Sequence, residues 1–323
     1  MSDFTEPSVA TWVAGRTFYD DPPPIDDLLA DKGRAGTTVG ICLPALDEEA
    51  TVGAICRTIV GELMDPGLVD QLVVVDSGST DATEAEATSA GARVVRAADL
   101  VPAAPPVTQG GKGESLWKSL AVMETDIVVW VDSDTRNFTA TFISALVAPL
   151  LDDRSLVFTK AFYERPLDRD AGLLPMGGAR VTELSVRPLI NLLCPELAGF
   201  IQPLSGEYAG RREALADLPF GTGYDVDLML LIDLVQRHGL EAIAQVDLGN
   251  RVHRNRDIPA LGRMSFEIVR SLLERLDEEG RLKLAETLPE ILTQFTDQDG
   301  DRSTSAYRAR SDRRPPMRSF LPS

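Results

Sequence analysis

The feature that most constrains the fold is an apolar segment that ends in two acidic residues. Residues 127–131 read Ile-Val-Val-Trp-Val, and Asp132-Ser133-Asp134 follows at once. A short apolar run of this kind is typical of a strand that is covered on both faces. In open parallel sheets, ligands bind beyond the carboxyl ends of the strands. The acidic pair therefore predicts a site for a hard divalent cation, and such an ion would meet a diphosphate. Short acidic pairs also occur at helix caps and solvated turns, but the apolar strand before this pair favours the metal site.

The segments around this strand alternate between strand and helix patterns. Strand patterns lie at 38–43, 72–75 and 93–96, and helical patterns lie at about 51–63 and 114–123. The alternation predicts an α/β fold with a mostly parallel sheet and right-handed crossovers. Beyond it we expect a helix at 141–151, a strand at 156–163, a helix up to about 193, a strand entering a helix at 208–215, a helix at 224–237, a strand at 242–246, and helices at 261–276 and 281–295.

The same patterns divide the chain into five parts. The last part, a tail over 296–323, has many Arg, Ser and Pro residues and few large apolar ones, so we expect it to be mobile. We expect an irregular lead-in with at most one short helix over 1–36, a nucleotide-binding half over 37–150, a second lobe over 151–257, C-terminal helices over 258–295 and the tail over 296–323.

Charge limits the partners of this chain. The formal net charge is -18, with 32 basic and 50 acidic residues among 323. Because such a field repels phosphate, we expect neither nucleic acid nor a membrane surface as a partner. Any phosphate must be bound locally, by a metal and a few well-placed cations.

The cysteine residues indicate the cellular compartment of the protein, and the apolar segments indicate whether it enters a membrane. Cys42, Cys56 and Cys194 are too few, and odd in number, for a disulfide framework, which predicts the reducing cytoplasm. We expect no secretory signal in the first residues. We also expect no membrane span, which would need roughly 20 apolar residues in a row.

Two glycine-flanked cations are candidates for binding anions. Lys112, between Gly111 and Gly113, can direct an ammonium to a phosphate, although a solvated loop lysine has the same pattern. Gly177-Gly178-Ala179-Arg180 at a predicted helix start suits a phosphate or a carboxylate. An ordinary helix start after a glycine turn is equally compatible with that segment.

One of the two histidines lies in a basic run. His253 stands among Arg251, Arg254 and Arg256 just after a predicted strand, whereas His238 fits a helix C-terminus. An imidazole that completes a carboxylate site would favour Mn²⁺ or Mg²⁺, with phosphate oxygens in the remaining positions. A surface histidine in a charged loop is the alternative. Three arginines beside it in so acidic a chain favour an anion site.

These segments together resemble a known family. Residues 43–49, 75–81, 112–114 and 132–134 resemble nucleotide-sugar glycosyltransferases with the GT-A fold, and 178–184, 202–208 and 252–255 are similar to the glucosyl-3-phosphoglycerate synthases. The resemblance covers most of residues 37–257. It implies a Rossmann-like, mostly parallel sheet with a smaller acceptor-binding lobe and C-terminal helices. It also implies a metal-dependent (Mg²⁺ or Mn²⁺), retaining transfer of glucose from UDP-glucose to the 2-hydroxyl of 3-phosphoglycerate, which leads towards methylglucose polysaccharide.

The resemblance also implies a role for each matching residue. Asp134 and His253 would bind the metal with Asp132 close by, and Asp132, Asp134, Arg180 and Asp227 form the catalytic set. The family is expected to have glutamate at Asp227, so this chain has a shorter side chain there. The acceptor would contact Gly178, Arg180, Val181, Thr182 and Asn255. The donor would contact Pro44, Ala45, Leu46, Glu48, Ser77, Lys112, Asp132, Ser133 and Arg251, with Leu204, Tyr224 and Asp227 around the glucose.

Several alternatives stay open at this point. A related transferase with another donor or acceptor, such as a mannosyl-3-phosphoglycerate synthase, has similar requirements. A sugar-nucleotide pyrophosphorylase usually has a glycine-rich first turn, and residues 44–49 contain no glycine. A non-catalytic nucleotide-binding module would not need the clusters around Arg180 and His253. The residues alone leave UDP-glucose or GDP-glucose, retention or inversion, and homodimer or monomer undecided.

Overall fold

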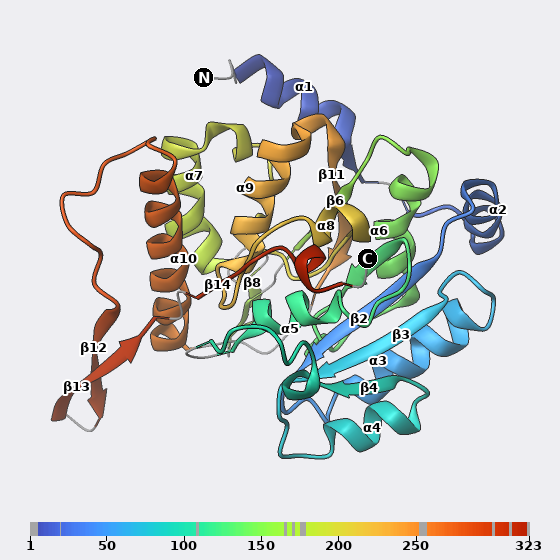
Figure 1. Cartoon of the computed structure of the whole chain (residues 1–323), viewed down its shortest axis with the longest axis horizontal. Coiled ribbons are helices and arrows are strands. Elements are labelled where there is room, and N and C mark those ends of the chain that lie inside the picture. Colours follow the sequence, from blue (N-terminus) through green and yellow to red (C-terminus); the bar gives the residue numbers. More distant parts are fainter. Residues whose placement is uncertain are drawn as a thin grey trace.

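The computed structural model describes residues 6–19, 21–107, 110–164, 167–169, 172–174, 179–251, 257–298, 301–309 and 312–321. At its centre lies an eight-stranded sheet with the spatial order β1 (Thr17–Phe18), β11 (Ile243–Asn250), β6 (Phe158–Glu164), β9 (Tyr208–Arg211), β5 (Ile127–Trp130), β2 (Val39–Ala45), β3 (Gln71–Asp76) and β4 (Arg93–Arg96) (Figure 1). Strand β9 runs antiparallel to β5 and β6, and all other neighbours pair in parallel. The predicted mostly parallel α/β sheet is confirmed.

The central strand is buried on both faces. Along β5, Val128 and Trp130 pack into one apolar core, whereas Ile127 and Val129 pack into a second. Successive side chains of a strand point to opposite faces, which explains why this strand reads as a continuous apolar run. The first core includes side chains of α5 (Lys112–Ser119), α7 (Arg187–Leu193), α9 (Val226–His238) and α10 (Ile258–Glu278), and the second includes those of α2 (Ile25–Ala35), α3 (Val52–Ile59), α4 (Thr83–Ser89) and α6 (Ala140–Asp152).

The predicted strand-to-helix segment at 208–215 is also present, as β9 followed by α8 (Arg212–Ala216). The domain boundaries at 150 and 257 stay predictions, because the sheet takes strands from both sides of residue 150. In the part of the chain that the structure describes, no helix is long and apolar enough to cross a bilayer.

The expectation of an irregular lead-in is wrong. Helix α1 (Glu6–Arg16) leads into β1, which extends the central sheet beside β11. Trp12 is buried, and its indole Nε1 donates to the Ile243 carbonyl oxygen at 2.8 Å. The three prolines at 22–24, which suggested an irregular segment, lie in the connection between β1 and α2. The lead-in therefore completes one edge of the sheet.

The expectation of a helix at 281–295 is wrong as well. Instead, β12 (Ile291–Gln298) pairs antiparallel with β13 (Asp301–Arg308), and the two strands project from the body next to α10 (Figure 1). Two residues, Asp299-Gly300, separate the strands in the sequence, and Asp-Gly is a strong hairpin signal. The predicted helix at 281–295 was inconsistent with this hairpin signal.

The tail from 312 to 321 is packed, which contradicts the expectation of mobility. Strand β14 (Arg313–Arg314) pairs with β10 (Phe220–Gly221), and Met317 is fully buried. Arg314 donates through Nε and Nη2 to the two carboxylate oxygens of Glu114 at 2.7 Å each, and its guanidinium stacks over Trp117. The composition of the tail suggested mobility, but the segment packs because Glu114 neutralises the charge of Arg314 inside the fold.

Replacing Arg314 tests how far the tail stabilises the fold. Arg314→Ala leaves the buried Glu114 carboxylate with Lys118 at 3.2 Å as its remaining cation. We expect the free energy of unfolding to fall by about 3 kcal/mol, measured by urea denaturation. The control Arg318→Ala breaks an exposed pair and should cost less than about 1 kcal/mol. Equal losses in the two variants would show that the buried pair adds nothing.

Candidate active site

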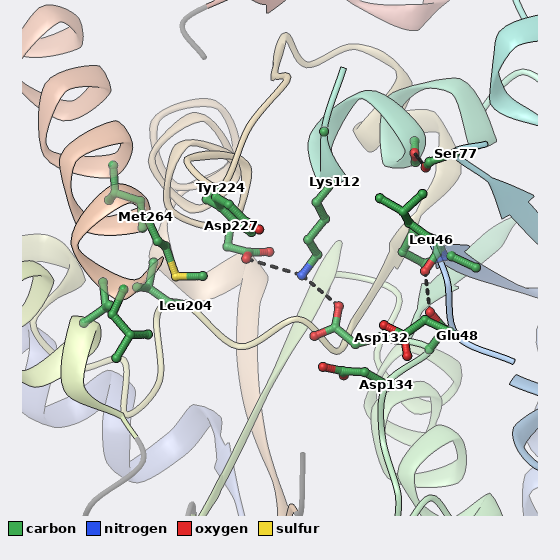
Figure 2. Close-up of a pocket in the computed structure, with 18 of the residues that line it drawn as sticks. Leu46, Glu48, Ser77, Lys112, Asp132, Asp134, Leu204, Tyr224, Asp227 and Met264 are labelled. Carbon is green, nitrogen blue, oxygen red and sulfur yellow. Dashed lines mark hydrogen bonds and ion pairs between the residues drawn. The ribbon is translucent and has the colours of Figure 1, made fainter. Parts of the chain in front are cut away.

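A cavity of about 390 Å³ opens at the carboxyl ends of β2, β3 and β5 (Figure 2). Its lining comes from segments that lie far apart in the sequence, and it contains every residue predicted to contact the donor: Pro44, Ala45, Leu46, Glu48, Ser77, Lys112, Asp132, Ser133, Leu204, Tyr224, Asp227 and Arg251. Asp134, Arg180, Val181 and Thr182 also line it. The structure thus brings the predicted donor and acceptor residues to one cavity. Gly178, His253 and Asn255 lie outside the described residues.

Hydrogen bonds between loops fix one wall of the cavity. The Thr83 hydroxyl accepts from the Glu48 N–H at 2.8 Å, and Asp47 Oδ1 accepts from the Thr80 N–H at 2.8 Å. The Ser133 hydroxyl donates to the Pro44 carbonyl oxygen at 2.7 Å. The loops after β2, β3 and β5 are therefore tied to one another. This holds Leu46, Glu48 and Ser133 in place before any ligand binds.

The Asp132 carboxylate lies between two cations. Lys112 Nζ is 2.9 Å from Asp132 Oδ1 and 3.4 Å from Asp227 Oδ2 (Figure 2). Arg251 Nη2 is 3.0 Å from both Asp132 Oδ2 and Asp134 Oδ1. Burial lowers the pKa of Lys112, but the carboxylates of Asp132 and Asp227 outweigh it, so the pKa lies above its ordinary value. Lys112 and Arg251 are therefore cations at neutral pH.

The approach of the chain to Asp132 requires a glycine. A Cβ atom added to Gly206 would lie 2.1 Å from Asp132 Oδ2, far inside van der Waals contact. Only glycine lets the backbone before β9 come this close to the acidic pair. The segment at 202–208 was part of the predicted family pattern, and the structure gives this physical reason for Gly206.

The donor atoms here suit a hard divalent cation. Asp132 and Asp134 offer carboxylate oxygens at the end of β5, and Mg²⁺ is commonly held by one or two carboxylates together with phosphate oxygens. Among the described residues, no group of three or more His, Cys, Asp or Glu side chains could hold a metal by itself. Two carboxylates with a diphosphate fit this requirement. His253 stays a predicted third ligand.

The residues predicted to contact the sugar and the acceptor lie at helix starts. Asp227 lies in the first turn of α9 and is nearly buried, and the neighbouring Tyr224 donates its N–H to Glu267 Oε2 at 3.2 Å. Arg180, Val181 and Thr182 lie where a π-helical turn, η3 (Thr182–Val186), begins. Backbone N–H groups at a helix start suit an anion.

Sequence reasoning missed the contribution of α10 and, apart from Lys112, that of the residues around the start of α5. Leu261, Met264 and Ile268 of α10 line the cavity, and Figure 2 shows Met264 on the side of Leu204 and Tyr224. The predicted helix at 261–276 is confirmed, but nothing in its amphipathic pattern distinguishes a face that lines a cavity from one that fills a core. Gly110, Gly111, Ser115 and Ala179 line the cavity too.

Three buried polar residues below the cavity were also missed. Glu207 and Lys160 are 0% and 1% exposed, and Tyr163 is buried beside them. Lys160 Nζ lies 4.3 Å from the centroid of the Tyr208 ring, and burial lowers the pKa of Lys160 to about 8. The available signal was a charged residue inside an apolar strand, since Lys and Glu are rarely buried without a reason.

The fold and the site define a sugar-transferring enzyme class. The family model described as Glycosyl transferase family 2 matches residues 40–202. Its match covers the strands β2, β3 and β5 and the loops that form the donor side of the cavity.

Individual relatives identify the family within this class. The glucosyl-3-phosphoglycerate synthase of Mycolicibacterium paratuberculosis is 49% identical over 268 residues, which is 82% of this chain and 80% of the relative. A solved structure of the Mycobacterium tuberculosis enzyme, in complex with Mn²⁺, UDP-glucose and phosphoglyceric acid, is 44% identical, has a TM-score of 0.80, and is matched over 94% of this chain and 98% of that chain. The same enzyme has been solved with Mg²⁺ and UDP. This chain belongs to the glucosyl-3-phosphoglycerate synthase family.

One further structure is similar over nearly its whole length. The mannosyl-3-phosphoglycerate synthase of Rubrobacter xylanophilus is 36% identical and has a TM-score of 0.88, with 97% of this chain and 98% of that chain matched. Its sequence identity is lower than that of the glucosyl enzymes, whereas its backbone agreement is higher.

The lowered pKa of Lys160 makes a prediction about stability. Because its pKa falls from 10.5 to about 8 on folding, protonated Lys160 opposes folding below pH 8, and this cost disappears as the pH rises towards 10.5. Lys160→Met should therefore raise the free energy of unfolding at pH 7 by up to about 3 kcal/mol. Urea denaturation from pH 7 to pH 10.5 should show the difference from the native protein shrinking. The exposed control Lys283→Met should change stability by less than about 0.5 kcal/mol.

Proposed function

We propose that this protein transfers glucose from UDP-glucose to the 2-hydroxyl of 3-phosphoglycerate and so forms glucosyl-3-phosphoglycerate. One observation carries the proposal: all the described residues expected to contact donor and acceptor line a single cavity. The related M. tuberculosis enzyme, 44% identical, has been solved with UDP-glucose and phosphoglyceric acid together. A cavity with separate cationic groups for two anionic substrates agrees with this pair.

The donor end of the cavity suits a nucleoside diphosphate. Leu46, Glu48 and Ser77 lie on the fixed wall and would contact uridine and ribose. Lys112 and Arg251 are the cations closest to the acidic pair and would face the diphosphate. In a chain with a net charge of -18, these local cations provide the attraction that the overall field does not.

Asp134, with Asp132 beside it, would hold Mg²⁺ or Mn²⁺, as we infer from their oxygen donors and from the relatives' complexes. When bound, this ion supplies Lewis acidity that stabilises the charge of the departing UDP. Arg251 Nη2 contacts both carboxylates and Lys112 contacts Asp132, so these ion pairs orient the two carboxylates.

The acceptor would bind opposite the donor wall. Arg180 can pair with the phosphate or carboxylate of 3-phosphoglycerate, and Val181 and Thr182 begin the helical turn beside it. Asp227, Tyr224 and Leu204 would surround glucose. Binding both substrates in one cavity brings the 2-hydroxyl to the anomeric carbon, which supplies the orientation that the transfer needs.

We propose that the transfer retains the anomeric configuration. Asp132 and Asp227 are both ion-paired with Lys112, so we assign them to binding and not to nucleophilic attack. A leaving phosphate oxygen would then accept the proton of the 2-hydroxyl on the face that UDP leaves. An inverting reaction with Asp227 as the base is the alternative, and NMR detection of a β-glucosyl product would establish it.

A mannosyl transfer is the second candidate, because the TM-score to the mannosyl-3-phosphoglycerate synthase is 0.88. The shorter Asp227 lies at the sugar end of the cavity, where donor choice would be made. Competition among UDP-glucose, GDP-glucose and GDP-mannose at equal concentrations would rank the donors.

We further propose a cytoplasmic homodimer. Leu184, Leu192 and Ile258 are 78%, 77% and 66% exposed, and Ser265 of α10 hydrogen-bonds Ser185 beside them, so these apolar side chains lie on neighbouring elements. Such a surface favours association with a second copy. All three cysteines are free and buried, in agreement with a reducing compartment. Light scattering of the purified protein and cell fractionation test these two points.

Substrate dependence tests the proposed reaction. We expect UDP release from UDP-glucose only when 3-phosphoglycerate and Mg²⁺ or Mn²⁺ are both present, and we expect ¹H NMR to identify an α-glucosyl product. Omission of either the acceptor or the metal is the control. Release of UDP at the same rate without 3-phosphoglycerate would contradict the proposal.

Arg180→Ala tests the acceptor assignment. Loss of a charge-assisted contact should raise the KM for 3-phosphoglycerate by about 10- to 100-fold. Binding of UDP with Mn²⁺, measured by calorimetry, should stay within about twofold, since UDP does not depend on this contact. The control is Arg96→Ala, which removes an exposed arginine paired with Glu84. An unchanged KM in Arg180→Ala would contradict the assignment.

A further inference from the structure

Glu207 is a carboxylate next to the site that does not line the cavity. Its side chain is 0% exposed, and both oxygens have partners. Oε1 lies 2.9 Å from Arg251 Nε, and Oε2 accepts from the Tyr163 hydroxyl at 2.8 Å. A carboxylate enclosed in this way has no path to the anomeric carbon of a sugar in the cavity. Glu207 can therefore influence the site only through the side chains that it contacts.

The group that it holds is Arg251. The Tyr163 hydroxyl accepts from Arg251 Nη1 at 3.2 Å, so Glu207, Tyr163 and Arg251 are linked in a closed ring by two hydrogen bonds and one ion pair. Thr135 Oγ1 accepts from Nε at 3.3 Å and from Nη2 at 3.2 Å, so the guanidinium is held at all three of its nitrogens. Nη2 also contacts Asp132 Oδ2 and Asp134 Oδ1, each at 3.0 Å. Because the guanidinium is planar, fixing one edge also fixes the direction of the other.

The charges around Arg251 explain why a buried carboxylate is needed there. Arg251 is 3% exposed, and a cation so deep in the protein must be neutralised from more than one side. Asp132 and Asp134 lie on the cavity side, where the diphosphate would bind. Glu207 supplies a negative charge from the side of the sheet, and this charge does not compete with substrate.

We infer that Glu207 is a positioning residue: together with Tyr163 it fixes Arg251, and through Arg251 it fixes the Asp132–Asp134 pair for a metal-bound nucleoside diphosphate. This inference rests on the proposed function. Groups that orient metal ligands from behind typically change metal or ligand affinity by about 10- to 100-fold when they are replaced.

Calorimetric titration of the full chain with UDP in the presence of Mn²⁺ tests the inference without requiring glucosyl transfer. Glu207→Gln keeps the shape and removes the charge, and we expect the Kd for UDP to rise about tenfold. Tyr163→Phe removes the hydroxyl with its two hydrogen bonds and keeps the charge of Glu207, and we expect a smaller rise of about threefold. The KM for 3-phosphoglycerate should stay within about twofold in both variants, because the acceptor contacts other residues.

Glu196→Gln is the matched control, since Glu196 also pairs with an arginine, Arg281, but lies away from the cavity. If the native protein does not bind UDP with Mn²⁺, the proposed function fails. If it binds UDP and both variants bind equally well, the positioning role alone is overturned. If Glu207→Gln does not fold, the Kd of Tyr163→Phe decides. A large fall in kcat of Glu207→Gln at unchanged UDP affinity would also overturn the role, because it would indicate direct participation.

Discussion

Asp132 is held between two cations that come from distant parts of the chain, with Lys112 Nζ at 2.9 Å and Arg251 Nη2 at 3.0 Å. A carboxylate at the floor of a cavity costs several kcal/mol unless it is paired, and the same holds for a buried guanidinium. The position of each group therefore depends on the others. Lys112 also reaches Asp227, and Arg251 also reaches Asp134 and Glu207, so the charged residues in and below the cavity share one set of ion pairs.

The fold brings these groups together because their strands lie side by side. Strand β5 carries Asp132 to the edge of the sheet, and β9 and β6 pair beside it and bring Glu207 and Tyr163 below the cavity. Arg251 follows β11, the next strand in the sheet. The single antiparallel strand, β9, places the segment containing Gly206 against Asp132. An acidic protein thus places Lys112 and Arg251 beside the carboxylates of the cavity.

The packed C-terminal segment supports the same site from behind. Arg314 pairs with Glu114 in helix α5, and the first residue of that helix is Lys112. The Trp117 indole in the same helix donates to the Pro315 carbonyl oxygen at 2.8 Å. Arg314 and Pro315 therefore hold the helix from which Lys112, a cavity-lining lysine, projects. The tail belongs to the structural frame of the active site.

The sequence by itself determined the sheet, its central strand and the donor and acceptor candidates. These features depend on local periodicity and on residues that follow strand ends, so the apolar run before Asp132 and the glycines around Lys112 were sufficient to find them. Tertiary structure decided the rest. Whether Glu207 and Lys160 are buried, whether Arg314 has a partner, and which carboxylates share Arg251 depend on contacts between positions far apart in the chain, such as the 119 residues that separate Asp132 from Arg251. Local patterns do not contain that information, because the free energy of a charge is set by the groups that surround it after folding.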